Sequence, residues 1–177
     1  MRIRAFSVRS HRCLLTSLSL VQICAAILDS NKLTQPDDLR VSIVSYRDHP
    51  PQDHSYITKT FPFTSSIPTV QEHLATLYAS GGGDGPEAVT AAMAVAVEGV
   101  EWRPEAAKMV VLIADAPMHG IGEYGDGFRD GSPDGELQSS RNPCTQHTDH
   151  LLVPSFIIGK DPLELARQMA SQGITML

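Results

Sequence analysis

The sequence has little cysteine and no cluster of basic residues beyond its first dozen positions. Its three cysteines, Cys13, Cys24 and Cys144, are too few and too scattered for a disulfide framework, which points to a reducing compartment or to simple buried thiols. A formal net charge of -6 argues against nucleic acid as a partner, because neutralising a phosphate backbone requires clustered Lys and Arg. The composition therefore excludes a disulfide-stapled scaffold and disfavours a nucleic-acid-binding protein.

The remaining composition is that of a folded protein. Hydrophobic residues make up 42% of the chain and charged residues 19%, which together are typical of globular rather than disordered sequences. At 177 residues, the chain is long enough to bury a sizeable core and has the length of one domain.

The first 28 residues allow two interpretations. Residues 2–12 contain four arginines and no acidic residue, and residues 13–28 are mostly apolar, a pattern that resembles a secretory signal or an organelle transit segment. The alternative is an ordinary helix with an apolar stripe from Leu14 to Leu28. We favour the helix because polar residues 29–31 end it, and we therefore expect a cytoplasmic protein. Ser, Thr and Gln within the stretch also argue against a stable membrane span.

Helix-like and strand-like segments alternate along the rest of the chain. Two nearly continuous apolar runs suit inner strands, and one more polar run has the character of an edge strand. Strands are predicted at residues 39–47, 55–61, 108–114 and 174–177, and helices at residues 70–78, 88–100 and 162–172. Asp161 is the expected cap of the last helix and Pro162 its first residue. This alternation predicts an α/β fold with a mostly parallel sheet covered by helices on both faces.

Asp115 ends the apolar strand KMVVLIAD and is followed at once by a turn. The carboxyl ends of the strands line the crevice where open α/β sheets bind ligands and ions, so a carboxylate at this point is a site candidate. An Asp that only caps the following turn is the alternative. We favour the site, which places a metal-binding or ligand-binding carboxylate at Asp115.

Asp84 follows three consecutive glycines in ASGGGDGPEA, just before a predicted helix. Without Cβ atoms, the glycines at 81–83 allow the backbone to turn sharply or to approach an ion closely. Pro86 and Glu87 suit the first turn of the helix. A helix-start turn rich in breakers explains the segment equally well by itself. A second acidic loop at an element boundary nevertheless makes Asp84 a companion candidate to Asp115.

Three further patterns are weaker signals. Residues 119–125, HGIGEYG, have the glycine spacing of a dinucleotide loop, but they do not open a helix that could hold a pyrophosphate. Asp126 and the aspartates at four-residue steps after it are expected to make turns, and His49 is expected to be a loop histidine. Residues 144–150 carry one Cys and two His at three-residue spacing, but no fourth zinc ligand is near, so incidental placement is favoured.

Three segments carry a family resemblance: RDHPPQDHSYITKTFPFTS, YASGGGDGPEAVTAAM and KMVVLIADAPMHGIGEYGDGF. Together they resemble a von Willebrand factor A domain, and more narrowly the fungal proteins whose A domain is similar to that of the alpha-kinase group. The resemblance implies a Rossmann-like three-layer fold. It also implies a divalent cation, usually magnesium, at the carboxyl end of the sheet, with Asp84 and Asp115 as metal-binding residues. A protein partner, whose carboxylate often completes the coordination shell, is implied as well.

The sequence departs from the pattern of that family at both ends and at one internal segment. Residues 9–19 stand where the family has its Asp-x-Ser/Thr-x-Ser loop, and they contain no acidic residue, so we expect magnesium binding to be weak or absent. We therefore expect an incomplete fold that lacks its first strand with the metal loop and its last strands. Residues 1–21 are an atypical N-terminal segment, residues 22–177 a partial A domain, and residues 136–160 an insertion within it.

The function expected from this resemblance is protein interaction without catalysis. The intact relatives bind protein partners through a magnesium-dependent surface, and a protein partner of unknown identity is expected here. The alternative is a fragment of an alpha-kinase-like serine/threonine protein kinase from which the kinase region is absent. The chain itself supplies neither a phosphate-binding Lys nor a catalytic Asp in a kinase-like context.

Overall fold

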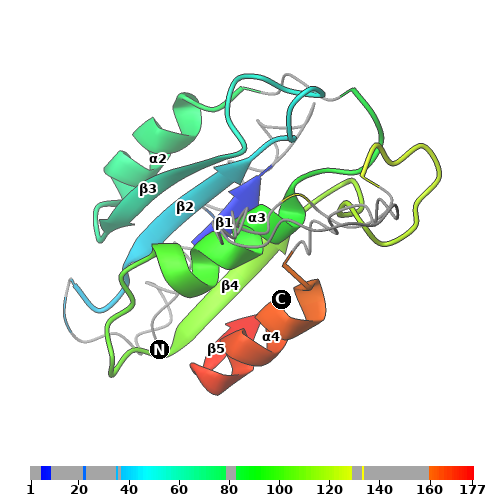
Figure 1. Cartoon of the computed structure of the whole chain (residues 1–177). Helices are drawn as coiled ribbons and strands as arrows, with labels where there is room; N and C mark the ends of the chain where they lie inside the picture. The colour runs from blue at the N-terminus through cyan, green and yellow to red at the C-terminus, as the bar shows by residue number, and fades with distance from the viewer. Residues whose placement is uncertain are drawn as a thin grey trace, which may run out of the picture.

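A mostly parallel sheet forms the centre of the molecule (Figure 1). The computed structural model describes residues 5–8, 22, 35, 37–78, 83–128, 133 and 160–177. Within these residues the sheet has five strands in the order β3-β2-β1-β4-β5, and β2 and β3 form its one antiparallel pair. The strands are β1 (Ala5–Val8), β2 (Val41–Tyr46), β3 (Thr58–Thr64), β4 (Lys108–Ile113) and β5 (Ile174–Met176). The predicted α/β class is confirmed, and β3 is the edge strand that its polar sequence indicates.

The sheet has a central first strand, so the expectation that this strand is missing was wrong. Phe6 of β1 pairs with Ile43 of β2 on one side and with Val111 of β4 on the other, both in parallel register. The strand is hard to recognise in the sequence because it is four residues long and lies between Arg4 and Arg9. Backbone hydrogen bonds to the two neighbouring strands define β1, and neither its length nor its composition predicts them.

The strand order reverses at β1. From β1 the chain adds β2 and β3 on one side of the sheet, and it then adds β4 and β5 on the other. Such a reversal leaves a crevice outside the carboxyl ends of the two diverging strands, which is where open α/β sheets bind ligands. The loops that follow β2 and β4 lie at this carboxyl edge.

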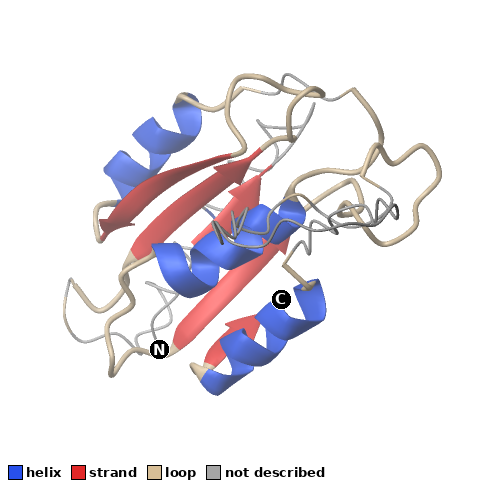
Figure 2. Ribbon diagram, viewed as in Figure 1, coloured by secondary structure: helices blue, strands red, loops and turns tan. Residues whose placement is uncertain are grey.

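Helices cover both faces of the sheet (Figure 2). Helix α2 (Ile67–Ala75) lies on one face, and α3 (Val89–Ala94), which continues as the π-helical turn η1 (Val95–Gly99), lies with α4 (Pro162–Ser171) on the other. Asp161 caps α4 by accepting a hydrogen bond from the Leu163 N–H at 2.8 Å, as its sequence indicates. The same pattern of capping opens α2, where Ser66 accepts from the Thr69 N–H.

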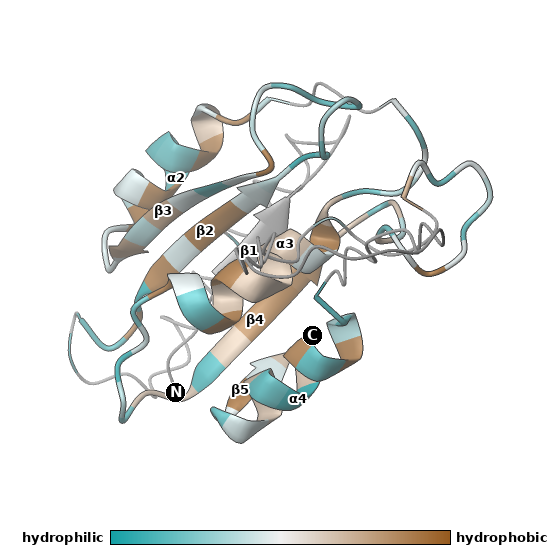
Figure 3. Cartoon of the chain, viewed as in Figure 1, coloured by the Kyte–Doolittle hydropathy of each residue, from teal (hydrophilic) through white to brown (hydrophobic). Residues whose placement is uncertain are grey.

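Strand β2 contributes to two separate cores because successive side chains point to opposite faces. Val44 and Tyr46 pack with α3 and α4, whereas Val41 and Ile43 pack with α2. All four side chains are 1% exposed, which is the burial expected of an inner strand covered on both sides. Figure 3 shows this apolar character running along β2 and β4 at the centre of the sheet.

Several sequence interpretations concern residues outside the described ones. The helix predicted at residues 13–28 except Gln22, the absent metal loop at residues 9–19, the insertion at residues 136–160 except Lys160, and the Cys/His segment at 144–150 belong to this group. Among the helices that the structure does describe, none has the length and apolar character needed to cross a membrane.

Candidate metal centre

Three loops meet at the carboxyl edge of the sheet. Asp48 follows the end of β2, His119 lies in the loop after β4, and Asp84 lies in the loop that leads into α3. Two backbone contacts join these loops. An isolated parallel bridge pairs Glu87 with Met118, and the Ala88 N–H donates to the Arg47 carbonyl at 3.0 Å. Polar side chains from segments far apart in the sequence are thereby brought together.

His119 is held between two carboxylates. Its Nε2 lies 2.6 Å from Asp48 Oδ1, and its Nδ1 lies 2.8 Å from Asp126 Oδ1. All three side chains are fully buried, with 0% exposure. Backbone N–H groups hold the carboxylates in turn: Asp126 accepts from Gly120 and Phe128, both at 2.8 Å. The imidazole ring therefore has a fixed position and orientation.

The charges in this group stabilise one another. Burial lowers the pKa of the His119 ring, but the hydrogen bonds and charges of Asp48 and Asp126 outweigh it and raise that pKa to about 9. For Asp126 burial acts in the opposite direction and raises the pKa. The hydrogen bonds from His119, Gly120 and Phe128 outweigh this effect, so the pKa of Asp126 is lowered. A pKa of about 9 favours the imidazolium form of the His119 ring at neutral pH in the metal-free protein.

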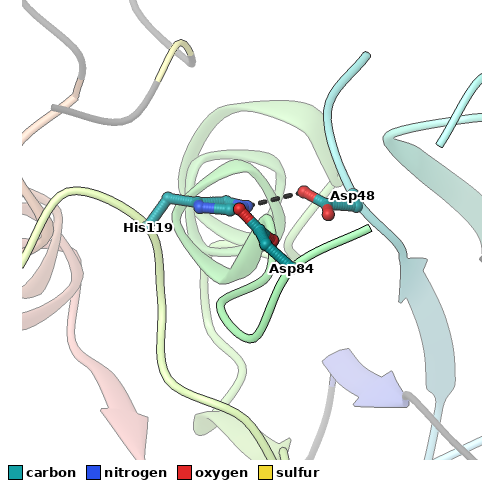
Figure 4. A group of neighbouring side chains, drawn as sticks. All are labelled: Asp48, Asp84 and His119. Carbon is teal, nitrogen blue, oxygen red and sulfur yellow. Dashed lines mark hydrogen bonds and ion pairs between the residues drawn. The ribbon is translucent and has the colours of Figure 1, made fainter. Parts of the chain in front are cut away.

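Asp84 completes a group that can hold a metal ion. One ligand atom from each of Asp48, Asp84 and His119 lies within 4.8 Å of the other two. Figure 4 shows the Asp84 carboxylate directed toward the His119 ring on the side where Asp48 approaches it. Asp84 Oδ2 accepts from the Gly127 N–H at 2.7 Å. Asp84 Oδ1 and Asp48 Oδ2 are buried and have no hydrogen-bond partner within the described part of the chain.

Glycines allow the loops around this group to pack directly on one another. A Cβ atom on Gly83 would lie 3.2 Å from the Cα atom of Gln52, in the loop that follows β2. A Cβ atom on Gly127 would lie 3.0 Å from Asp84 Oδ2 and would also meet the Gln52 side chain. The glycine loop was expected to turn sharply or to approach an ion closely, and the group that Gly83 approaches in the structure is Gln52 of a neighbouring loop.

The two residues predicted from the sequence have different surroundings. Asp84 belongs to the three-residue group. Asp115 lies two residues beyond β4 at the same edge and is exposed, and within the described part of the chain it lies outside the group formed by Asp48, Asp84 and His119.

Three residues of this centre were missed by sequence reasoning. Asp126 was expected only to make a turn, and neither Asp48 nor His119 was singled out. His49, expected to be a loop histidine, is buried, and its ring lies 5.8 Å from that of His119. The available signal was the position of Asp48 directly beyond an apolar strand, which is the criterion that selects Asp115.

The donor set does not match magnesium. Magnesium binds oxygen ligands in near-ideal octahedral geometry, and it is usually held by one or two carboxylates with several waters. Here one of the three protein donors is an imidazole nitrogen, which suits zinc and other transition ions better. The magnesium implied by the family resemblance therefore finds no suitable set of donors in this group.

Comparison with known proteins indicates a relationship over part of the chain. No family model matches the sequence. A segment of 79 residues, 43% of the chain, is 38% identical to a protein named alpha-protein kinase vwkA from Dictyostelium discoideum. The aligned segment spans 12% of the length of that relative. The identity supports common ancestry of the aligned segment, but it covers too little of the relative to assign this chain its family or its activity.

Proposed function

We propose that this chain is a von Willebrand A-type interaction domain that binds a protein partner at the carboxyl edge of its sheet. The fold supports the proposal, since a mostly parallel sheet with its strand order reversed at β1 presents a binding crevice at that edge. The relative named alpha-protein kinase vwkA also supports it, because that name suggests a von Willebrand A segment.

The observation that carries the proposal is the exposure of large apolar side chains on the loops of this edge. Among the described residues, Tyr124 is 95% exposed and Tyr78 is 69% exposed, and Ile121 and Ile57 are exposed as well. Protein interfaces are enriched in aromatic side chains, and a tyrosine offers a large contact area that loses little conformational entropy on binding. We call these four residues the edge patch.

Arg47 gives the edge patch a rigid base. Its guanidinium lies over the rings of Tyr56 and Tyr78, at 4.6 and 4.9 Å from their centroids. It also donates to the Tyr78 carbonyl at 3.2 Å and to Ser55 Oγ at 2.6 Å. A pre-ordered Tyr78 loses less entropy when a partner binds, which favours affinity.

The proposed role is non-catalytic. His119 has the chemistry of a general base, but both of its ring nitrogens are engaged by carboxylates and the ring has no exposure. A general base must reach the proton that it removes, directly or through one water. An enclosed imidazole of this kind favours a structural or metal-binding role over acid–base catalysis.

The test is a binding comparison between two matched surface variants. The double variant Ile121→Ser and Tyr124→Ala alters the edge patch, and Leu163→Ser alters another exposed apolar residue, on α4. A partner captured from the organism that expresses this chain is identified, purified and titrated against each protein by calorimetry. We expect at least about a tenfold loss of affinity for the double variant and none for Leu163→Ser. Equal binding by all three proteins, or no partner at all, would refute the proposal.

A second candidate function rests on the kinase relative. The chain would then act as the non-catalytic segment of an alpha-kinase-like protein, and the edge patch would position a substrate or the kinase region. A phosphotransfer assay on the chain alone distinguishes this non-catalytic role from a kinase activity of the chain itself. Transfer of phosphate from ATP to a protein substrate by this chain would overturn both proposed functions, since both are non-catalytic.

A further inference from the structure

We propose that Asp48, Asp84 and His119 form a binding site for a transition-series divalent cation of the zinc type, and that Asp126 positions the imidazole ligand. This site differs in both ligands and metal from the magnesium site implied by the family resemblance. The proposal does not depend on partner binding at the edge patch.

The ligand types select the class of metal. One imidazole nitrogen and two carboxylate oxygens, each from a different loop, lie within 4.8 Å of one another. Zinc is commonly held by three protein ligands of His and Asp or Glu type, with a fourth position left for water or another ligand. The imidazole suits zinc, and the order of affinities among divalent transition ions favours it over manganese.

Two buried oxygen atoms point to a ligand that the protein alone does not provide. Asp48 is 0% exposed, and its Oδ2 has no hydrogen-bond partner among the described residues. Asp84 Oδ1 is buried in the same situation, while its Oδ2 is held by Gly127. A buried carboxylate oxygen without a donor loses its hydration without compensation. A cation coordinated between these oxygens supplies that compensation.

Asp126 has the geometry of a residue that orients a metal-binding histidine. His119 Nδ1 lies 2.8 Å from Asp126 Oδ1, and Asp126 Oδ2 accepts from the Gly120 N–H at 2.8 Å. A histidine that binds metal through one nitrogen usually donates from the other to a carboxylate, a backbone carbonyl or water, which fixes the tautomer. With Nδ1–H donated to Asp126, Nε2 is the nitrogen directed toward Asp48 and Asp84.

The charge of the group also favours a dication. Three carboxylates surround one imidazole, so the group carries excess negative charge whether the ring is neutral or protonated. In the metal-free protein the hydrogen bond of 2.6 Å between Nε2 and Asp48 Oδ1 requires a proton on one of these two atoms. A cation that binds Nε2 takes the place of this proton, which leaves to solvent.

Metal titration of the full chain tests the proposal. The protein is treated with a chelator and titrated by calorimetry with zinc chloride and, separately, with magnesium chloride. We expect one zinc ion to bind on the order of 100-fold or more tightly than magnesium. Cobalt serves as a spectroscopic probe, because its visible absorption reports a low-coordinate site with a nitrogen ligand.

Three substitutions of Asp by Asn, which hardly change the size of the side chain, identify the residues of the site. Asp84→Asn retains an oxygen for the Gly127 N–H but loses the charge, and we expect it to lose zinc binding and the cobalt absorption. Asp126→Asn changes the positioning residue, and we expect zinc affinity to fall by about 10- to 100-fold. Asp115→Asn, at the same edge and outside the group, is the matched control and should leave zinc binding unchanged. Circular dichroism verifies that each variant is folded.

The contrary outcomes are distinct. Zinc binding that persists in folded Asp84→Asn assigns the metal to other residues, such as the Cys and His side chains at 144–150, and overturns the proposal. Magnesium binding that is tighter than zinc binding and is lost in Asp115→Asn restores the site implied by the family resemblance. If neither metal binds, the Asp48, His119 and Asp126 group is a structural ion-pair network only, and the proposal fails.

Discussion

His119 and Asp48 are joined by a buried hydrogen bond of 2.6 Å, although 71 residues separate them in the chain. The bond ties the loop after β4 to the loop after β2 across the central strand β1. It therefore fixes the relative positions of the two loops at the point where the strand order of the sheet reverses.

Removing the charge of Asp48 should destabilise the metal-free protein. In Asp48→Asn the buried His119 ring loses one of its two carboxylates, and breaking a buried ion pair on one side usually costs about 3 kcal/mol or more. Urea unfolding in the presence of a chelator measures this change. Asp115→Asn serves as the control, and because its side chain is exposed we expect a change within about 0.5 kcal/mol. Equal effects of the two substitutions would contradict the role given to the His119 group.

Stability should fall at alkaline pH because of His119. The pKa of its ring is raised from 6.5 to about 9 in the folded protein, so its contribution is fully present below pH 6.5. As pH rises toward 9, the unfolded chain has lost this proton while the folded chain still binds it, and the contribution disappears. The loss amounts to at most on the order of 3 kcal/mol. Urea unfolding with a chelator present measures this loss of stability over about pH 6 to pH 10, a range that includes both pKa values of His119.

The acidic side of the same profile has a separate origin. The pKa of Asp126 is lowered in the folded protein, so its contribution to stability is present above the ordinary pKa of 3.8 and is lost as pH falls through the lower folded value.

The variant His119→Gln tests the alkaline side, and we expect it to flatten that part of the stability profile. A wild-type profile that is already flat between the two His119 values would show that the ring is not held as an imidazolium.

A Cβ atom should be tolerated at Gly85 but not at Gly83. In Gly83→Ala the new atom lies 3.2 Å from the Cα atom of Gln52, and backbone atoms cannot move aside as the end of a side chain can. We expect a loss of about 1–3 kcal/mol in unfolding free energy. In Gly85→Ala the new Cβ atom meets nothing within 4 Å, so the substitution should be neutral or should stabilise the protein by about a few tenths of a kcal/mol. Thermal and urea unfolding of the two variants provide the comparison.

Deleting residues 1–8 should abolish cooperative folding. The deletion removes β1, which separates β2 from β4 and pairs with both. Deletion of residues 1–4 is the control, because β1 begins at Ala5. Size-exclusion chromatography and urea unfolding distinguish a folded monomer from an associating chain. If the protein without residues 1–8 remains a cooperative monomer, the sheet does not require β1.

The sequence predicted most elements of the fold because each carries a local signal. The apolar runs of β2 and β4, the polar edge strand β3 and the Asp161 cap of α4 depend on residues close together in the chain. Strand β1 carries no such signal, since its four residues are defined by partners far away in the sequence.

Only the part of the candidate site that carries a local signal in the sequence was predicted. Asp84 stands out through its glycines, and it belongs to the group of three residues that could hold a metal ion. The contacts of His119 with Asp48 and Asp126 arise from the packing of loops, which no local pattern encodes. Asp48, like Asp115, is a carboxylate directly beyond an apolar strand segment, so the sequence does carry a local signal for it.

The position of β1 has a consequence for the order in which the protein assembles during synthesis. Its residues leave the ribosome before those of the other described strands, yet one of its two partners, β4, is made about a hundred residues later. Until then, one side of β1 lacks the partner that it has in the finished sheet. Such long-range parallel pairing slows folding and exposes unpaired strand edges while it is incomplete. The nascent chain is therefore expected to need protection, for example by a chaperone, until β4 has emerged.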